Sequence, residues 1–207
     1  MESQVKTGTT TVGIVCKDCV VLAADMRATV GNMILEEDAE KVHKVAKNIG
    51  LTIAGGVSAA QLVIKHLKSQ IKLHELRVQR TLNIKEAANM VGGWLHGLVR
   101  SGNIVHFLMG GYDATGGAQL YDVFPDGSVM PKKHYFSSGS GSVFALGVLD
   151  SQYTPDLSEA EGIALAEKAI QTAIKRDSAS GNGINLMVIN KDGVDIRPTK
   201  VFESTLK

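Results

Sequence analysis

The order of hydrophobic patterns along the chain restricts its fold more than any other feature of the sequence. From residue 9 to residue 54, short apolar runs alternate with turn residues, which predicts strands joined in hairpins. Gly55-Gly56 ends this region, and the period then changes. Residues 58–80 carry apolar side chains at three- and four-residue steps, the spacing of a helix with one apolar face.

A second helix is expected directly after the first. Asn83 is followed three residues later by Glu86, a pairing that caps helix N-termini, and the apolar stripe continues to about residue 100. Ser158 and Glu161 form the same pattern and predict a further helix near the C-terminus.

Strand patterns return between and after the helices. They are predicted at residues 104–112, 118–123, 130–137, 184–190 and 194–197, with a short helix from about 142 to 149. The expected order of elements favours an α+β fold over alternating βαβ units, because strands are followed by two helices, then by strands, two more helices and final strands. Because most strand positions are apolar, both faces of each sheet should be covered. We therefore expect two antiparallel sheets packed together with a helix pair outside each.

Composition excludes several classes of protein. The 207 residues are 44% hydrophobic and 21% charged with a net charge of +1, which gives no bulk attraction for nucleic acid or an anionic membrane. No apolar run reaches the roughly 18 residues of a membrane span, and Met1–Gly8 lacks the apolar centre of a secretory signal. We expect one domain in a cytoplasmic protein. Phosphate-binding loops and the common zinc-protease and serine-hydrolase motifs are absent from the sequence.

Two cysteines, Cys16 and Cys19, are separated by Lys17-Asp18. This spacing is compatible with half of a zinc site or with a redox pair. No second pair of ligands at zinc spacing exists among the six histidines. Two reduced thiols beside a hairpin turn is the interpretation that we favour, and no metal is expected.

The stretch Gly8-Thr9-Thr10-Thr11 opens the first predicted strand. Threonine is common in strands, so the run can reflect β-propensity alone. A threonine hydroxyl can also act as a nucleophile when a base takes its proton, and the α-amino group of a chain start has a pKa near neutrality, about 7.7–8.0. Thr9 would gain such an amine only after cleavage of the Gly8–Thr9 bond.

Other polar residues gather at the ends of predicted strands and the starts of helices. Asp25 follows an apolar strand, Lys41 begins a hairpin, and Gly55 precedes a helix whose free N–H groups can bind an oxyanion. Ser140 and the pair Asp177 and Ser180 stand where helices meet glycines. Taken one at a time, each can be a turn, a cap or a solvated residue.

In their joint order and spacing, these residues resemble the proteasome β subunits, which are N-terminal nucleophile hydrolases. The resemblance runs from Gly8 to about Pro198. The residues that carry it are Thr9-Thr10-Thr11-Val12-Gly13, Ala24-Asp25-Met26-Arg27-Ala28-Thr29, Lys41, Ala54-Gly55-Gly56, Gly139-Ser140-Gly141-Ser142 and Arg176-Asp177-Ser178-Ala179-Ser180-Gly181. It implies a four-layer αββα sandwich, with residues 1–8 as an autocleaved propeptide and 9–207 as one domain.

The resemblance also implies roles for matched residues. Thr9 would be the nucleophile, its freed amine the proton acceptor, and Lys41 a cation that lowers the pKa of the Thr9 hydroxyl. Asp25 would fix Lys41, and the Gly55 N–H would stabilise the oxyanion. A further three residues would orient the amine: Ser140, Asp177 and Ser180. The positions that match the family's primary pocket are all apolar, which predicts cleavage after hydrophobic residues: Ala28, Ala39, Ile53 and Val57.

The family assembles as seven-membered β rings, stacked in pairs and flanked by α rings, with unfolded polypeptides delivered by an ATPase. The resemblance therefore implies α-subunit partners, a second β ring and no cofactor. Two alternatives remain open. One is an inactive ring subunit, although Gly8-Thr9 and Lys41 are present. The other is the bacterial ATP-dependent ring protease, which typically lacks the pattern Asp25-Met26-Arg27.

Overall fold

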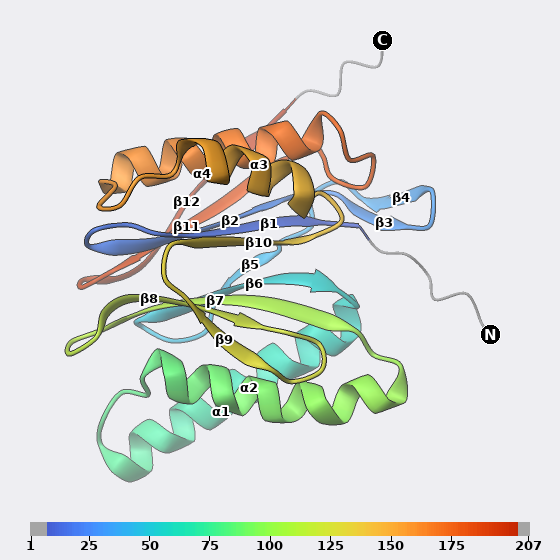
Figure 1. The fold of residues 1–207 in the computed structure, drawn as a ribbon. Coiled ribbons are helices and arrows are strands. Elements are labelled where there is room, and N and C mark those ends of the chain that lie inside the picture. The colour runs from blue at the N-terminus through green and yellow to red at the C-terminus, as the bar shows by residue number, and fades with distance from the viewer. Residues whose placement is uncertain (1–7, 203–207) are drawn as a thin grey trace.

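Four layers of secondary structure make up the computed structural model, which describes residues 8–202 (Figure 1). Helices α1 (Val57–Val78) and α2 (Ile84–Leu98) cover the outer face of one sheet. Helices α3 (Ser142–Gln152) and α4 (Glu159–Ile174) cover the outer face of the other. The α+β class and the αββα layering predicted from the sequence are confirmed.

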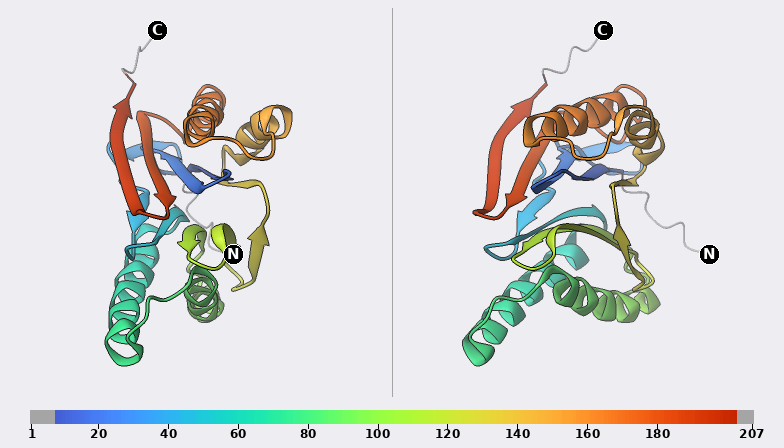
Figure 2. Two further views of the ribbon diagram at one scale, coloured as in Figure 1. Left: turned by 90° about the vertical axis from the view of Figure 1, so that its left-hand side faces the viewer. Right: turned by 60° about the vertical axis from the view of Figure 1, so that its left-hand side comes forward.

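Both large sheets are antiparallel and five-stranded. The first has the order β10-β1-β2-β11-β12, with β1 Thr10–Val15, β2 Cys19–Asp25, β10 Tyr135–Gly139, β11 Gly183–Asn190 and β12 Gly193–Val201. The second has the order β5-β6-β7-β8-β9, with β5 Val42–Lys44, β6 Ile49–Gly55, β7 Val105–Asp113, β8 Gly117–Val123 and β9 Val129–Lys132. Figure 2 shows the two sheets stacked between the helix pairs.

Two smaller elements complete the fold. A hairpin of β3 (Ala28–Val30) and β4 (Met33–Glu36) extends from the edge of the sandwich, and a 3-10 turn, η1 (Val99–Ser101), follows α2. Every residue of β2 is buried, because helices cover one face of its sheet and the second sheet covers the other.

Local sequence signals set the helix starts. The Asn83 side chain accepts the Glu86 N–H at 2.8 Å, and the Glu86 carboxylate accepts the Asn83 N–H at 3.0 Å. Ser158 and Glu161 form the equivalent box at the start of α4. Both predicted capping boxes are confirmed.

The single strand predicted at residues 130–137 is wrong. The segment forms β9 and β10, and these lie in different sheets. The break falls at Lys133-His134, where the chain leaves the edge strand β9 and crosses to the edge of the other sheet (Figure 1). Polar residues between two apolar runs do not reveal such a crossing. The crossing matters because β10 leads directly to Ser140.

The two cysteines lie beside the β1–β2 turn, as predicted. Both are free and buried, and the Cys16 N–H donates to the Cys19 carbonyl at 2.8 Å. Within residues 8–202, no cluster of three or more potential metal-ligating side chains occurs. No helix in the same part of the chain is long and apolar enough to cross a membrane.

Candidate active site

Thr9 lies immediately before β1 and is almost fully buried. Its Oγ1 donates to the Gly8 carbonyl oxygen at 2.6 Å, so the hydroxyl already touches the carbonyl group that precedes it. The Thr9 nitrogen is an amide and donates its N–H to Ser140 Oγ at 3.1 Å. An amide nitrogen has no basicity, so the chain with residues 1–8 attached holds a potential nucleophile without its terminal amine.

Asp25, the last residue of β2, is completely buried. Its Oδ1 accepts the Thr10 N–H at 2.9 Å and the Lys41 ammonium at 2.8 Å. Its Oδ2 accepts the backbone N–H groups of Arg27 at 3.0 Å and Gly181 at 2.9 Å. These four donors compensate the cost of burying a carboxylate and join β1, β2 and the 177–182 loop at one point.

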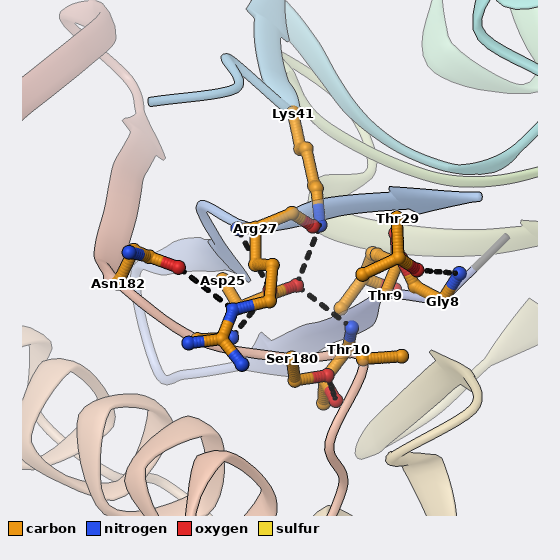
Figure 3. Close-up of polar contacts among 12 residues, drawn as sticks. Gly8, Thr9, Thr10, Asp25, Arg27, Thr29, Lys41, Ser180 and Asn182 are labelled. Carbon is orange, nitrogen blue, oxygen red and sulfur yellow. Dashed lines mark hydrogen bonds and ion pairs between the residues drawn. The ribbon is translucent and has the colours of Figure 1, made fainter. Parts of the chain in front are cut away.

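Lys41 reaches the site from the residue before β5, and its side chain is only 6% exposed. Its Nζ bonds to Asp25 Oδ1 and, at 2.5 Å, to the Arg27 carbonyl oxygen (Figure 3). Burial lowers the pKa of Lys41 from its ordinary value, and the negative charge of Asp25 opposes that effect. Lys41 is thus a fixed positive charge with Asp25 as its counter-ion, and Lys41 lines the same cavity as Thr9.

A chain of hydroxyl groups and one carboxylate lies next to the Thr9 nitrogen. Ser140 Oγ donates to Asp177 Oδ2 at 2.6 Å, and Ser180 Oγ donates to the same oxygen at 2.7 Å. The three residues for which the resemblance implied an orienting role are therefore joined through Asp177. Two of them meet Thr9 or its neighbour, because Ser140 Oγ bonds to the Thr9 backbone and Ser180 Oγ to Thr10 Oγ1.

Gly55 ends β6 and lines the same cavity as Thr9. Its φ of +104° is a conformation that favours glycine, and a Cβ here would overlap the Ile104 carbonyl oxygen. The next residue, Gly56, is the N-cap of α1. A helix start with its N–H groups therefore lies at the wall of the cavity.

A cavity of about 110 Å³ is open beside Thr9. The four residues assigned to the substrate pocket all line it, together with Lys41 and Gly55: Ala28, Ala39, Ile53 and Val57. The β3–β4 hairpin adds three residues that were not assigned to the pocket from the sequence: Thr29, Val30 and Leu35. Most of the lining is apolar, and Glu40 is the acidic side chain among the described residues that line it.

Two residues near Thr9 have no role in the sequence analysis. Thr10 Oγ1 lies 2.7 Å from Ser180 Oγ. The Arg27 guanidinium donates to Asn182 Oδ1 at 2.8 Å and to the Ser178 carbonyl at 3.0 Å, which ties the loop after α4 to the end of β2 (Figure 3). Both belong to the motifs that carry the resemblance, but only the folded chain brings their partners next to them.

The chain is similar over most of its length to known proteins. A family profile described as "Proteasome subunit" matches residues 5–189. A protein from Methanococcus maripaludis strain C5 is 40% identical over 97% of this chain and 91% of its own. One from Haloferax volcanii is 43% identical over 98% of this chain and 82% of its own. One from Methanocaldococcus jannaschii is 40% identical over 96% of this chain and 89% of its own. All three relatives carry the name proteasome subunit beta.

Proposed function

Since this chain belongs to the proteasome subunit family and is of the β type, we propose that it is a threonine endopeptidase that removes its own residues 1–8. One observation carries the proposal. The Thr9 hydroxyl lies 2.6 Å from the Gly8 carbonyl oxygen, and Thr9 lines the same cavity as Lys41, whose ammonium is paired with Asp25.

Self-cleavage begins with attack of Thr9 Oγ1 on the Gly8 carbonyl carbon. The Gly8–Thr9 C–N bond breaks, the Thr9 nitrogen takes up the proton that the hydroxyl loses, and Gly8 becomes an ester on Oγ1. Water then hydrolyses this ester, which releases residues 1–8 and restores the hydroxyl. The Thr9 nitrogen is now an amine whose pKa lies close to neutral pH.

The same groups then act on substrates. The amine is formed where the Thr9 nitrogen lies, 3.1 Å from Ser140 Oγ, so the Ser140–Asp177–Ser180 network orients it. It accepts the hydroxyl proton while the Lys41 charge lowers the pKa of that hydroxyl. The Gly55 N–H stabilises the oxyanion, a contribution of about 3–4 kcal/mol in other enzymes. Asp25 keeps Lys41 in place.

Substrate choice follows from the cavity wall. The residue before the scissile bond places its side chain among Ala28, Ala39, Ile53 and Val57, whose apolar surfaces favour a hydrophobic side chain. We propose that the enzyme cleaves unfolded polypeptides after such residues.

As a proteasome subunit of the β type, the chain forms part of the proteasome core with α subunits. The finer arrangement belongs to the proposal: seven β subunits form a ring that stacks on a second β ring, and α rings close the particle. A regulatory ATPase delivers unfolded chains. Enclosure keeps the active threonines away from folded proteins in the cytoplasm, the compartment proposed for the particle.

N-terminal sequencing and intact mass of the β chain from assembled particles test the proposal. We expect active particles to contain chains that begin at Thr9. A Thr9→Ala variant should assemble, keep residues 1–8 and hydrolyse no peptide. Active wild-type particles whose β chains retain Gly8 would contradict the proposal, whereas assembled particles that retain Gly8 and hydrolyse no peptide would favour the inactive ring subunit.

A further inference from the structure

Gly8 is held from three directions. Its N–H donates to Thr29 Oγ1 at 3.1 Å (Figure 3). Its carbonyl oxygen accepts the Thr9 hydroxyl at 2.6 Å. On the third side, its Cα faces Ala179 in the loop between α4 and β11. Because both polar groups of Gly8 are bound, the residue cannot turn away from Ala179 without losing a buried hydrogen bond.

There is no room for a side chain at position 8. A Cβ built on Gly8 would overlap the Ala179 Cβ, and it would lie 3.1 Å from the Ala179 Cα and 3.2 Å from Ser140 Oγ. At 3.2 Å the Ser140 hydroxyl needs to shift by only a few tenths of an ångström. Ala179 presents a methyl group directly attached to the backbone and cannot give way.

The structure also fixes Ala179 in place. Its N–H donates to Asp177 Oδ1 at 3.2 Å, and the next residue, Ser180, donates its N–H to the Asp177 carbonyl at 3.1 Å. Arg27 bonds to the carbonyl of Ser178 at 3.0 Å. A shift of Ala179 would therefore move Asp177 and Ser180, the groups next to the Thr9 nitrogen.

The direction of this Cβ is informative. It points at Ala179, which is not among the described residues that line the apolar cavity beside Thr9. A substrate residue at the scissile bond must instead direct its side chain into that cavity. Residue 8 of the uncleaved chain and the matching residue of a substrate therefore meet different walls.

We propose that Ala179 restricts residue 8 to glycine, so that the 177–180 loop, and not the substrate cavity, sets the specificity of self-cleavage. This inference rests on the proposed function, because it concerns the attack of Thr9 on the Gly8 carbonyl. Any larger residue at position 8 displaces the carbonyl carbon from the Thr9 hydroxyl before the bond can break.

The test is a set of variants, each coexpressed with the α-subunit partner and followed by intact mass of the β chain during particle assembly. Gly8→Ala should slow cleavage at Thr9 by at least about tenfold, the usual size of a one-methyl overlap in a packed site. Adding Ala179→Gly should restore most of the rate, because it removes the overlapping methyl. Gly8→Val with Ala179→Gly is the matched control and should stay uncleaved, because one methyl makes no room for three carbon atoms.

The possible outcomes distinguish failure of this inference from failure of the proposed function. If wild-type active particles retain residues 1–8, the proposed function fails. If the wild type matures and Gly8→Ala matures at the same rate, only the role of Ala179 is refuted. It is also refuted if Ala179→Gly fails to rescue Gly8→Ala, or if Ala179→Gly alone blocks cleavage after Gly8, because the methyl would then support the site and not select the residue.

Discussion

Lys41 Nζ lies 2.8 Å from Asp25 Oδ1, and both side chains are almost fully buried. The two partners differ in what else holds them. Asp25 also accepts three backbone N–H groups, from Thr10, Arg27 and Gly181, whereas Lys41 has one further partner, the Arg27 carbonyl. The carboxylate is thus held by the backbone, and the ammonium depends on the carboxylate.

Lys41→Ala should abolish both self-cleavage and peptide hydrolysis, with a loss of at least about a hundredfold, because the hydroxyl then ionises without an adjacent cation. Intact mass and hydrolysis of a fluorogenic peptide measure the two reactions. Retention of normal turnover would show that the charge is not used in the way we propose.

Asp25→Asn should destabilise the fold more than Lys41→Ala does. Removing the carboxylate charge leaves a buried ammonium without a counter-ion, which costs about 3–5 kcal/mol in proteins. Removing Lys41 leaves a carboxylate with three N–H donors. Thermal unfolding of particles that carry each variant compares them, and equal destabilisation would contradict the asymmetry.

Activity and stability should respond oppositely to alkaline pH where Lys41 titrates. Burial lowers the pKa of Lys41 below 10.5, so the unfolded chain binds more protons than the folded chain between the two pKa values. This group therefore contributes more to stability as the pH rises through that window, while activity falls because the ammonium is lost. A rate–pH profile and Tm measured on the same samples test this. Activity that stays constant up to pH 10.5 would be inconsistent with it.

The sequence predicts the parts of this structure that depend on local chemistry. Asn83 and Glu86 mark a helix start because they bond to each other within one turn. The side-chain contacts of Thr10 and Arg27 could not be predicted, because their partners lie 151 to 170 residues away and meet them only when β11 pairs with β2. The division of residues 130–137 between two sheets was missed for the same reason. The residues of the site could be singled out because they match those of the family that the sequence resembles. The overlap between a side chain at position 8 and the Ala179 methyl could not, because it depends on how the folded chain places these two distant residues.

Thr10→Val should lower kcat several-fold with little effect on KM, because Ser180 loses its 2.7 Å partner and holds Asp177 less firmly. Thr11→Val is the matched control. The Thr11 hydroxyl forms a bond of the same length, to Ser138, and is equally buried, but it does not contact the Ser140–Asp177–Ser180 network. Similar kinetic losses in both variants would mean that Thr10 acts only through general packing.

Among peptides that differ only in the residue before the scissile bond, the leucine peptide should have the highest kcat/KM, and the arginine and glutamate peptides should have lower values. A charged side chain in the cavity meets Ala28, Ile53 and Val57, which offer no compensating partner. An apolar side chain instead gains about 0.8 kcal/mol for each methylene group that it buries there. Glu40 lines the same cavity, and the Lys41 charge there is already paired with Asp25, so arginine should be tolerated better than glutamate. Glu40→Gln should reduce kcat/KM for the arginine peptide and leave that for the leucine peptide nearly unchanged. Equal kcat/KM for all three peptides would place the selectivity outside this cavity, on surfaces that a neighbouring subunit supplies.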